Sequence, residues 1–323
     1  MLVAGVDGGG TQTRVALVDG AGETLGVGVG GGSFVHDLGV EKARENIGRA
    51  FQEAWNHAAV KARPLDFVFL GMAGVADDAD RNTILRIALD LNLATRDRIE
   101  VDHDLRIALA GGLTGRPGIV LIAGTGSSCY GRRADGRSWI SGGWGHLLDD
   151  VGSSYYLGLH ALIAMARACD GRGRATTLRS AVMARLGISD VLQIMQRVYI
   201  QGLSRVEIAA MAPLVTQAAA AGDSVALEIL AAATRELALM VETAARKLEF
   251  GPGETLVTAT GGLPQSGAPF TPMLFDAIRR AVPWCEIVEP ALQPLQGAAL
   301  LALDHAGIAS SPDLIERLKH SQT

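Results

Sequence analysis

One pattern occurs twice in this chain and limits what it can fold into: an apolar strand, a glycine-rich turn and a returning strand. In the first half, residues 2–7 run apolar into a Gly-Gly-Gly turn at 8–10, and in the second half residues 119–123 run into a Gly-Thr-Gly turn at 124–126. Glycines let a backbone bend sharply and approach a ligand closely. The repetition predicts two similar α/β halves facing each other across a cleft, with one glycine turn on each wall.

The hydrophobic periodicity around these turns predicts alternating strands and helices. Strands at 2–7, 13–19 and 24–29 are expected to form an antiparallel meander, followed by a helix at 41–59. Further strands are expected at 65–71, 98–101, 128–132, 139–140, 255–260 and 286–288, and helices at 78–92, from Asp104, at 153–169, over 204–249, at 272–281 and from Gly297.

Length and charge restrict the class of protein. The chain has 323 residues, of which 48% are apolar, which is enough to bury two cores. Its formal net charge of -5 argues against nucleic acid or an anionic membrane as the main partner. No basic region precedes the apolar start, and no apolar stretch approaches the length of a membrane span. Three cysteines without a C-x-x-C pair suggest a reducing compartment, so we expect a cytoplasmic protein.

The first glycine turn has the composition of a phosphate-binding loop. Three glycines allow consecutive N–H groups to point into one concavity, which favours an anion. Thr11 and Thr13 add hydroxyl donors, and Asp7 is a hard oxygen ligand for Mg²⁺ or its waters. An ordinary glycine-rich hairpin is the alternative. A Walker A loop and a dinucleotide fingerprint are both excluded, because no Lys-Ser/Thr follows and a strand comes next.

The second turn, at 124–127, repeats this chemistry, and two such turns favour a phosphate clamp over two ordinary hairpins. Between them lies Asp102-His103-Asp104, at the end of a predicted strand. A carboxylate at this place is commonly a helix N-cap. The alternative is a general base, since phosphoryl transfer needs a carboxylate that accepts the proton of the attacking hydroxyl. Asp104 is suited to that task by type and place.

A third motif, Gly-Gly-Trp-Gly-His-Leu-Leu-Asp-Asp at 142–150, combines a flexible turn, an aromatic ring and two carboxylates. Such groups can accept hydrogen bonds from sugar hydroxyls and stack on a sugar ring. The alternative is a helix N-terminus at which Asp149 or Asp150 is stabilised by the helix dipole.

The order of these motifs, with Thr-Gly-Gly at 260–262 after them, resembles the N-acetylglucosamine kinase family. That family is grouped with the BadF/BadG/BcrA/BcrD ATPases in the actin/hexokinase/Hsp70 superfamily. The resemblance covers nearly the whole chain. It implies two ribonuclease-H-like domains of mixed sheets flanked by helices, with the active-site cleft between them. The first domain would span 1–116, with a C-terminal helix at 297–323 packing back on it, and the second would span 117–296.

The same resemblance implies an ATP-dependent kinase for the 6-hydroxyl of N-acetylglucosamine, glucosamine or a related amino sugar, with Mg²⁺, Asp104 as base and a homodimeric assembly. The chain departs from the family near 33–36 and at Ser128 and Val151, so the phosphate machinery matches better than the sugar contacts. Nucleotide contacts would come from Asp7, Gly8, Gly9, Gly10, Thr11, Thr13, Gly124, Thr125, Gly126, Ser127, Gly261 and Gly262, and sugar contacts from Ser33, His36, Ser128, Cys129 and Asp150.

Two other classes exist within this superfamily. A redox activator would carry an iron–sulfur cluster on paired cysteines, but Cys129 follows the second turn and the surrounding sequence does not match. A non-catalytic nucleotide sensor would be expected to have lost the base or a phosphate loop, and both are present. A zinc-containing glucokinase is disfavoured because its cysteine cluster is absent.

Overall fold

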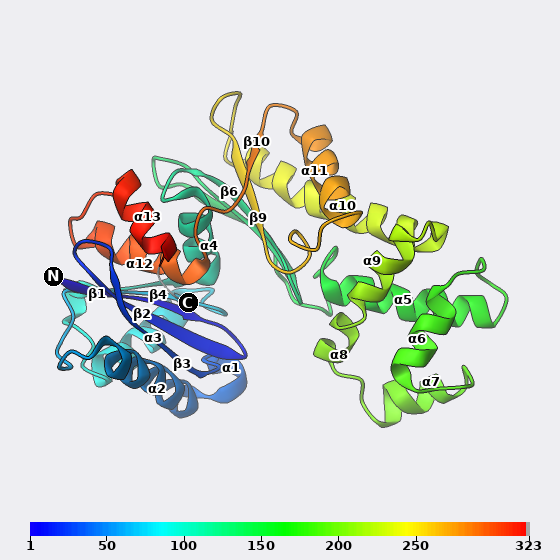
Figure 1. Cartoon of the computed structure of the whole chain (residues 1–323), viewed down its shortest axis with the longest axis horizontal. Coiled ribbons are helices and arrows are strands. Elements are labelled where there is room, and N and C mark those ends of the chain that lie inside the picture. Colours follow the sequence, from blue (N-terminus) through cyan, green and yellow to red (C-terminus); the bar gives the residue numbers. More distant parts are fainter. Residues whose placement is uncertain (321–323) are drawn as a thin grey trace. The chain divides into compact units, whose positions relative to one another are not determined.

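The computed structural model describes residues 1–320 and divides the chain into two compact units (Figure 1). The first consists of Met1–Pro117 and the residues from Glu289 onward, and the second is Gly118–Val288. Each unit holds one five-stranded sheet. Within the described part of the chain, no helix combines the length and the apolar character that crossing a membrane requires.

The sheet of the first unit has the strand order β3-β2-β1-β4-β5. Strands β1 to β3 form the predicted antiparallel meander, while β4 and β5 run parallel to β1. In the register of the parallel strands, Asp7 lies beside Gly71, and Gly71 lies beside Asp102. The carboxyl ends of three strands therefore meet at one edge. The strands are β1 (Leu2–Gly8), β2 (Gln12–Asp19), β3 (Thr24–Gly31), β4 (Phe67–Met72) and β5 (Ile99–His103).

Helices cover both faces of this sheet, because its strands are apolar on both sides. Along β1, Ala4 and Val6 pack in the core under α2 and α3, whereas Val3 packs in the core under α4, α12 and α13. Figure 1 shows the two helical layers on either side of the first sheet. The helices of this unit are α1 (Val35–Leu38), α2 (Val40–Ala58), α3 (Asp78–Asp90), the 3-10 turn η1 (Arg96–Arg98), α4 (Asp104–Leu113), α12 (Pro294–His305) and α13 (Pro312–His320).

The second sheet repeats the strand plan of the first, in the order β10-β9-β6-β7-β8. Strands β6, β7 and β8 form an antiparallel meander, and β9 and β10 continue the sheet in parallel. This repetition of a mixed sheet with helices confirms the predicted fold class. The strands are β6 (Gly118–Ala123), β7 (Ser127–Arg132), β8 (Ser138–Gly142), β9 (Leu256–Thr260) and β10 (Glu286–Val288).

The core of the second unit lies between one face of its sheet and a group of helices. Ile119, Leu121 and Ala123 of β6 pack there with Val257 and Ala259 of β9. The helices are α5 (Ser154–Cys169), α6 (Leu178–Leu186), α7 (Gln193–Met195), the π-helical turn η2 (Gln196–Ile200), α8 (Arg205–Ala209), α9 (Ala212–Ala220), α10 (Ser224–Lys247) and α11 (Phe270–Ala281).

Three segments differ from the expectation. The region 204–249 is not continuously helical, because Gly222 adopts a φ of 87° and the Asp223 side chain caps a new helix, α10. The last helix begins at Pro294 and ends at His305; a separate α13 follows, and residues 321–323 of the predicted helix lie outside the described residues. Between 170 and 203, where no element was predicted, the chain forms α6, α7 and η2.

Candidate active site

The first glycine turn presents backbone donors to solvent. The carbonyl of Gly8 accepts a hydrogen bond from the N–H of Ala73 at 2.7 Å, and the carbonyl of Gly9 accepts one from the N–H of Ser33 at 3.0 Å. Over residues 1–320, no protein acceptor takes the N–H groups of Gly10 and Thr11, and both residues are exposed. Unpaired N–H groups in a turn form a concavity suited to an anion.

Thr13 does not belong to this concavity, so its predicted contact with the nucleotide is wrong. Its side chain is fully buried, and its hydroxyl donates to the carbonyl of Gly31 at 2.9 Å. The residue lies on the same side of β2 as the core residues Val15 and Leu17, because strand side chains alternate with a period of two. Thr13 therefore ties β2 to β3.

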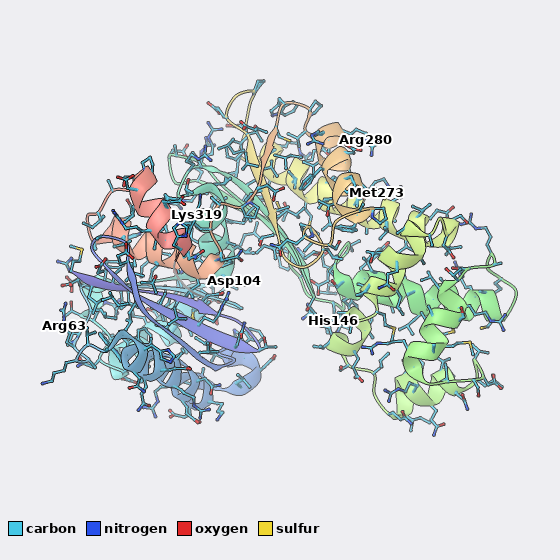
Figure 2. The ribbon with its side chains drawn as sticks, in the orientation of Figure 1. Arg63, Asp104, His146, Met273, Arg280 and Lys319 are labelled. Carbon is cyan, nitrogen blue, oxygen red and sulfur yellow. The ribbon has the colours of Figure 1, made fainter. Side chains whose placement is uncertain are left out.

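Asp104 and Asp7 are two of the carboxylates at the edge where β1 and β5 end. Asp104 is the first residue of α4 and is partly buried (Figure 2). Loss of hydration on burial, and secondly the negative charge of Asp7, raise the pKa of Asp104 to about 6. A carboxyl group with this pKa is ionised at neutral pH and still basic enough to accept a proton from a hydroxyl as that hydroxyl reacts.

The N-cap of α4, which was the alternative role for Asp104, is His103. Its ring Nδ1 accepts a hydrogen bond from the N–H of Arg106 at 3.2 Å, and burial lowers the pKa of His103. Asp102 is occupied too, because its Oδ1 accepts a hydrogen bond from Nη2 of Arg81 at 2.9 Å. Within the Asp-His-Asp motif, Asp102 thus pairs with Arg81 and His103 caps the helix, so neither of these roles falls to Asp104.

Asp7 is a carboxylate of the kind that could hold a hydrated Mg²⁺. Its Oδ2 accepts a hydrogen bond from Nη2 of Arg14 at 3.0 Å, and its side chain is 21% exposed. Among residues 1–320, no group of three or more His, Cys, Asp or Glu side chains could hold a metal ion. Mg²⁺ does not require such a cage, because proteins usually hold it with one or two carboxylates together with substrate phosphates and water.

The loop after β3 brings Ser33 to the first turn but directs His36 elsewhere. Ser33 is buried against Gly8, and its Oγ has no hydrogen-bond partner in the part of the chain that the structure describes. The ring of His36 is exposed, and its Nε2 lies 2.9 Å from Oδ1 of Asp80 on α3. Of these two predicted sugar contacts, Ser33 is the one held beside the turn.

The second glycine turn is fastened to the start of α5. The carbonyls of Gly124 and Thr125 accept hydrogen bonds from the N–H groups of Ser154, at 2.8 Å, and Tyr155, at 3.3 Å. No acceptor within residues 1–320 takes the N–H groups of Thr125 and Gly126. This turn, like the first, presents two free backbone donors. Beside it, the ring of His146 packs edge-on against Tyr155 (Figure 2).

Ser127 and Asp150 lock the end of this turn. Ser127 donates its hydroxyl to the carbonyl of Val151 at 2.8 Å and its N–H to Oδ1 of Asp150 at 3.1 Å. Asp150 is 3% exposed and has a φ of 57°. Its Oδ2 pairs with Nη2 of Arg205 at 2.7 Å. The sequence analysis missed Arg205, because nothing in the sequence relates it to a residue 55 positions earlier.

The other predicted contacts in the second unit do not share one environment. Cys129 is fully buried in the hydrophobic core, where burial raises the pKa of its thiol, so the prediction that this side chain lines the sugar site is wrong. Ser128, the neighbouring residue, is partly buried and lies beside Gly143. Gly261 lies against Ala123, and Gly262 follows it in the chain. The turn after β9 therefore adjoins the second glycine turn.

Two sequence relatives span most of the chain. An N-acetylmuramic acid/N-acetylglucosamine kinase of Clostridium acetobutylicum is 33% identical over 263 residues, which are 81% of this chain and 85% of the relative. An N-acetyl-D-glucosamine kinase of Dictyostelium discoideum is 29% identical over 313 residues, 94% of this chain and 98% of that protein.

Solved structures extend the comparison. A Chromobacterium violaceum structure whose proposed activity is that of an N-acetylglucosamine kinase matches with a TM-score of 0.75 and 29% identity, over 94% of this chain and 98% of that one. A ROK family glucokinase from Streptomyces griseus, at 18% identity and a TM-score of 0.58 over 96% of this chain and all of that one, shares the actin/hexokinase-like fold. Residues 4–302 match the BadF/BadG/BcrA/BcrD ATPase family, and the chain belongs to that family.

Proposed function

We propose that this protein is an ATP-dependent kinase that phosphorylates the 6-hydroxyl of N-acetylglucosamine or of a related hexosamine such as glucosamine. The observation that carries the proposal is the environment of Asp104: a partly buried carboxylate with a pKa of about 6 beside a turn with free N–H groups. Two relatives that span most of the chain are amino-sugar kinases by name, which supports the substrate class.

In the proposed reaction, Asp104 accepts the proton of the sugar hydroxyl while its oxygen attacks the γ-phosphorus of ATP. A new O–P bond forms, the bond from the γ-phosphorus to the bridging oxygen breaks, and ADP leaves with that electron pair. The free N–H groups of the two turns would donate to phosphate oxygens and orient them. Mg²⁺, held near Asp7, would neutralise charge on the phosphates.

For the sugar we propose contacts from Asp150, Ser128 and Ser33. Asp150 places two carboxylate oxygens beside the second turn, and Ser33 places an unpartnered hydroxyl beside the first. The exposed ring of Trp144, in the loop that leads to Asp150, offers an apolar surface of the kind that stacks on a sugar. Gly261 and Gly262 are proposed to contact the adenosine part of ATP. A cytoplasmic homodimer completes the proposal; the family resemblance supports the homodimer, and the three cysteines without a C-x-x-C pair support the reducing compartment.

The redox-activator alternative loses support from the position of Cys129. A cluster ligand needs a thiolate that reaches the metal, and Cys129 points into the core of the second unit. The other cysteines, Cys169 and Cys285, are partly buried on α5 and just before β10. A colourless, iron-free protein after anaerobic purification is the expected result, and a stoichiometric iron–sulfur absorbance would reverse this choice.

The direct test of the proposed function is ADP formation from Mg-ATP against a panel of sugars. N-acetylglucosamine, glucosamine, N-acetylmannosamine, N-acetylmuramic acid and glucose differ at the positions that an amino-sugar kinase must recognise. We expect one amino sugar to stimulate ADP formation strongly, with the phosphate found on its 6-hydroxyl by NMR. Absence of stimulation by every sugar in the panel would refute the proposal, and strong preference for glucose would refute its substrate class.

A further inference from the structure

Arg205 joins two parts of the second unit that are far apart in the sequence. Its Nη2 pairs with Oδ2 of Asp150 at 2.7 Å, while Oδ1 of the same carboxylate accepts the N–H of Ser127, the residue that ends the glycine turn. A single buried carboxylate therefore connects helix α8 to the proposed phosphate loop. Arg205 itself is 39% exposed, so the pair lies at the boundary between core and solvent.

The backbone at Gly126 is shaped for this pair. A Cβ atom at that position would lie 2.6 Å from both Nη2 of Arg205 and Oδ1 of Asp150. A Cβ there would have to displace the ends of both side chains, so the turn, the carboxylate and the guanidinium lie in close contact at this point. The close approach involves the same turn whose N–H groups are free for phosphate.

Helix α8, which carries Arg205, is itself fixed in place. Ser204 and Glu207 form a capping box at its start: the Ser204 hydroxyl accepts the N–H of Glu207, and the Glu207 carboxylate accepts the N–H of Ser204. At its other end, Gly158 of α5 allows contact with the backbone of Ile208, since a Cβ on Gly158 would overlap the Ile208 carbonyl oxygen at 1.8 Å. Arg205 therefore reaches Asp150 from a rigid support.

We propose that Arg205 is a positioning residue of the active site, which holds the carboxylate of Asp150 in register with the second glycine turn so that this carboxylate can bind the acceptor sugar. The inference rests on the proposed function, because it takes Asp150 as a sugar contact. It adds a residue that no motif marked and gives α8, a five-residue helix, a part in substrate binding.

The physical reason is the cost of a buried carboxylate. An ionised carboxylate that is 3% exposed needs an opposite charge and hydrogen bonds to stay in place. Arg205 and the Ser127 N–H each occupy one site on a different oxygen, and a carboxylate has about four acceptor sites. Each oxygen of Asp150 thus retains capacity for a sugar hydroxyl while its orientation is fixed. Without Arg205 the carboxylate would lose the partner that fixes its Oδ2, and it could turn away from the position in which it is proposed to bind the sugar.

A double-mutant cycle tests the inference: Arg205→Ala, Asp150→Asn and the double variant, with Arg205→Lys as the conservative replacement. The control is Arg133→Ala, which removes an arginine of the same unit that binds two backbone carbonyls and Glu254. We expect Arg205→Ala to raise the KM for the sugar at least about tenfold, because small displacements of positioning groups cost one to two orders of magnitude. Arg205→Lys should recover part of the loss, and nucleotide affinity without sugar should change less than the sugar KM.

In the Asp150→Asn background, removing Arg205 should have little further effect, because the two residues act as one unit. Arg133→Ala should lower the melting temperature and leave the sugar KM near that of the wild type. The inference is overturned if Arg205→Ala keeps the wild-type sugar KM, if its effect adds fully to that of Asp150→Asn, or if Arg133→Ala raises the KM equally. A wild-type protein that phosphorylates no sugar would instead refute the proposed function, and the inference with it.

Discussion

The two units share one strand plan but treat their glycine turns differently. In the first unit, the turn carbonyls are bound by residues that follow two other strands, Ser33 after β3 and Ala73 after β4. In the second unit, they are bound by the first residues of helix α5. Both solutions direct carbonyls into the protein and leave N–H groups free. The shared outcome indicates that the backbone plan of each unit, and not a particular side chain, leaves these donors free.

The carboxylates beside the two turns differ in the same way. In the first unit, Asp104 is partly buried next to another negative charge, Asp7, and its pKa is raised to about 6. In the second unit, Asp150 is paired with Arg205 and fixed by a backbone N–H. A carboxylate beside another carboxylate is suited to accept a proton, and one bound by a guanidinium is suited to hold a fixed orientation. This difference supports the proposal that Asp104 is the base and that Asp150 is a sugar contact.

Asp150→Ala is expected to give the largest effect among the changes in the second unit. It removes both the proposed sugar contact and the partner of Arg205, so kcat/KM for the sugar is expected to fall about a hundredfold or more. Steady-state kinetics with the preferred sugar will measure this, and calorimetry will report nucleotide binding. An Asp150→Ala variant with wild-type kcat/KM would contradict the proposal that Asp150 anchors the sugar.

The pH dependence of the reaction should report Asp104. A base with a pKa of about 6 is lost by protonation below that pH, so kcat/KM should fall about tenfold per pH unit on the acid side. The charge of Asp7 is the second cause of the raised pKa, so Asp7→Asn should move the acid limb to lower pH. The protonation of free ATP changes with pH in the same way in both assays, so it cancels when the profile of Asp7→Asn is compared with that of the wild type. An acid limb that stays fixed in Asp7→Asn would contradict the account.

A smaller effect is expected on stability. The folded-state pKa of Asp104 lies above its usual value of 3.8. Between about pH 4 and pH 6, the folded protein therefore binds more protons than the unfolded chain. As the pH rises through that range, this group lowers the free energy of unfolding. Asp104→Asn removes the free-energy cost of keeping an ionised carboxylate at this buried position. We expect it to raise the free energy of unfolding by about 1–3 kcal/mol above pH 6, with no gain below pH 4. Urea titrations at pH 4 and pH 8 will measure the difference, and a destabilised variant at pH 8 would show that Asp104 has a structural role.

The smallest effect should come from Thr13, because the structure removes it from the site. Thr13→Ser keeps the hydroxyl that bonds the Gly31 carbonyl, and we expect kcat and the KM for ATP to stay within about twofold of wild type, with a modest loss of stability. A large rise in the KM for ATP would indicate that Thr13 contributes to nucleotide binding.

The sequence allowed the sheets to be predicted because their signals are local. Apolar runs interrupted by glycine turns marked β1, β2, β6 and β7 to within one or two residues. Thr13 was predicted as a hydroxyl donor and Cys129 from the family resemblance, and neither prediction took the strand period into account. Thr13 shares the side of β2 that carries Val15 and Leu17, and neighbours such as Ser128 and Cys129 must face opposite sides of β7. That rule was available from the sequence.

The pairing of Arg205 with Asp150 could not be predicted from the sequence. The Ser204–Glu207 capping box is a readable start signal for α8. It fixes the start of the helix but says nothing of where that helix packs, since this depends on the contact of Ile208 with Gly158 of α5. Long-range contacts between irregular segments are set by tertiary packing.

The central claim is that Asp104 is the base, and sugar-dependent ADP formation by Asp104→Asn tests it most directly. Asp102→Asn is the matched control, because it makes the same change two residues earlier in a carboxylate that pairs with Arg81. The account predicts that Asp104→Asn loses turnover by about a thousandfold or more while it still folds and binds ATP, and that Asp102→Asn retains substantial turnover. An Asp104→Asn protein that phosphorylates its sugar at close to the wild-type rate would contradict the account.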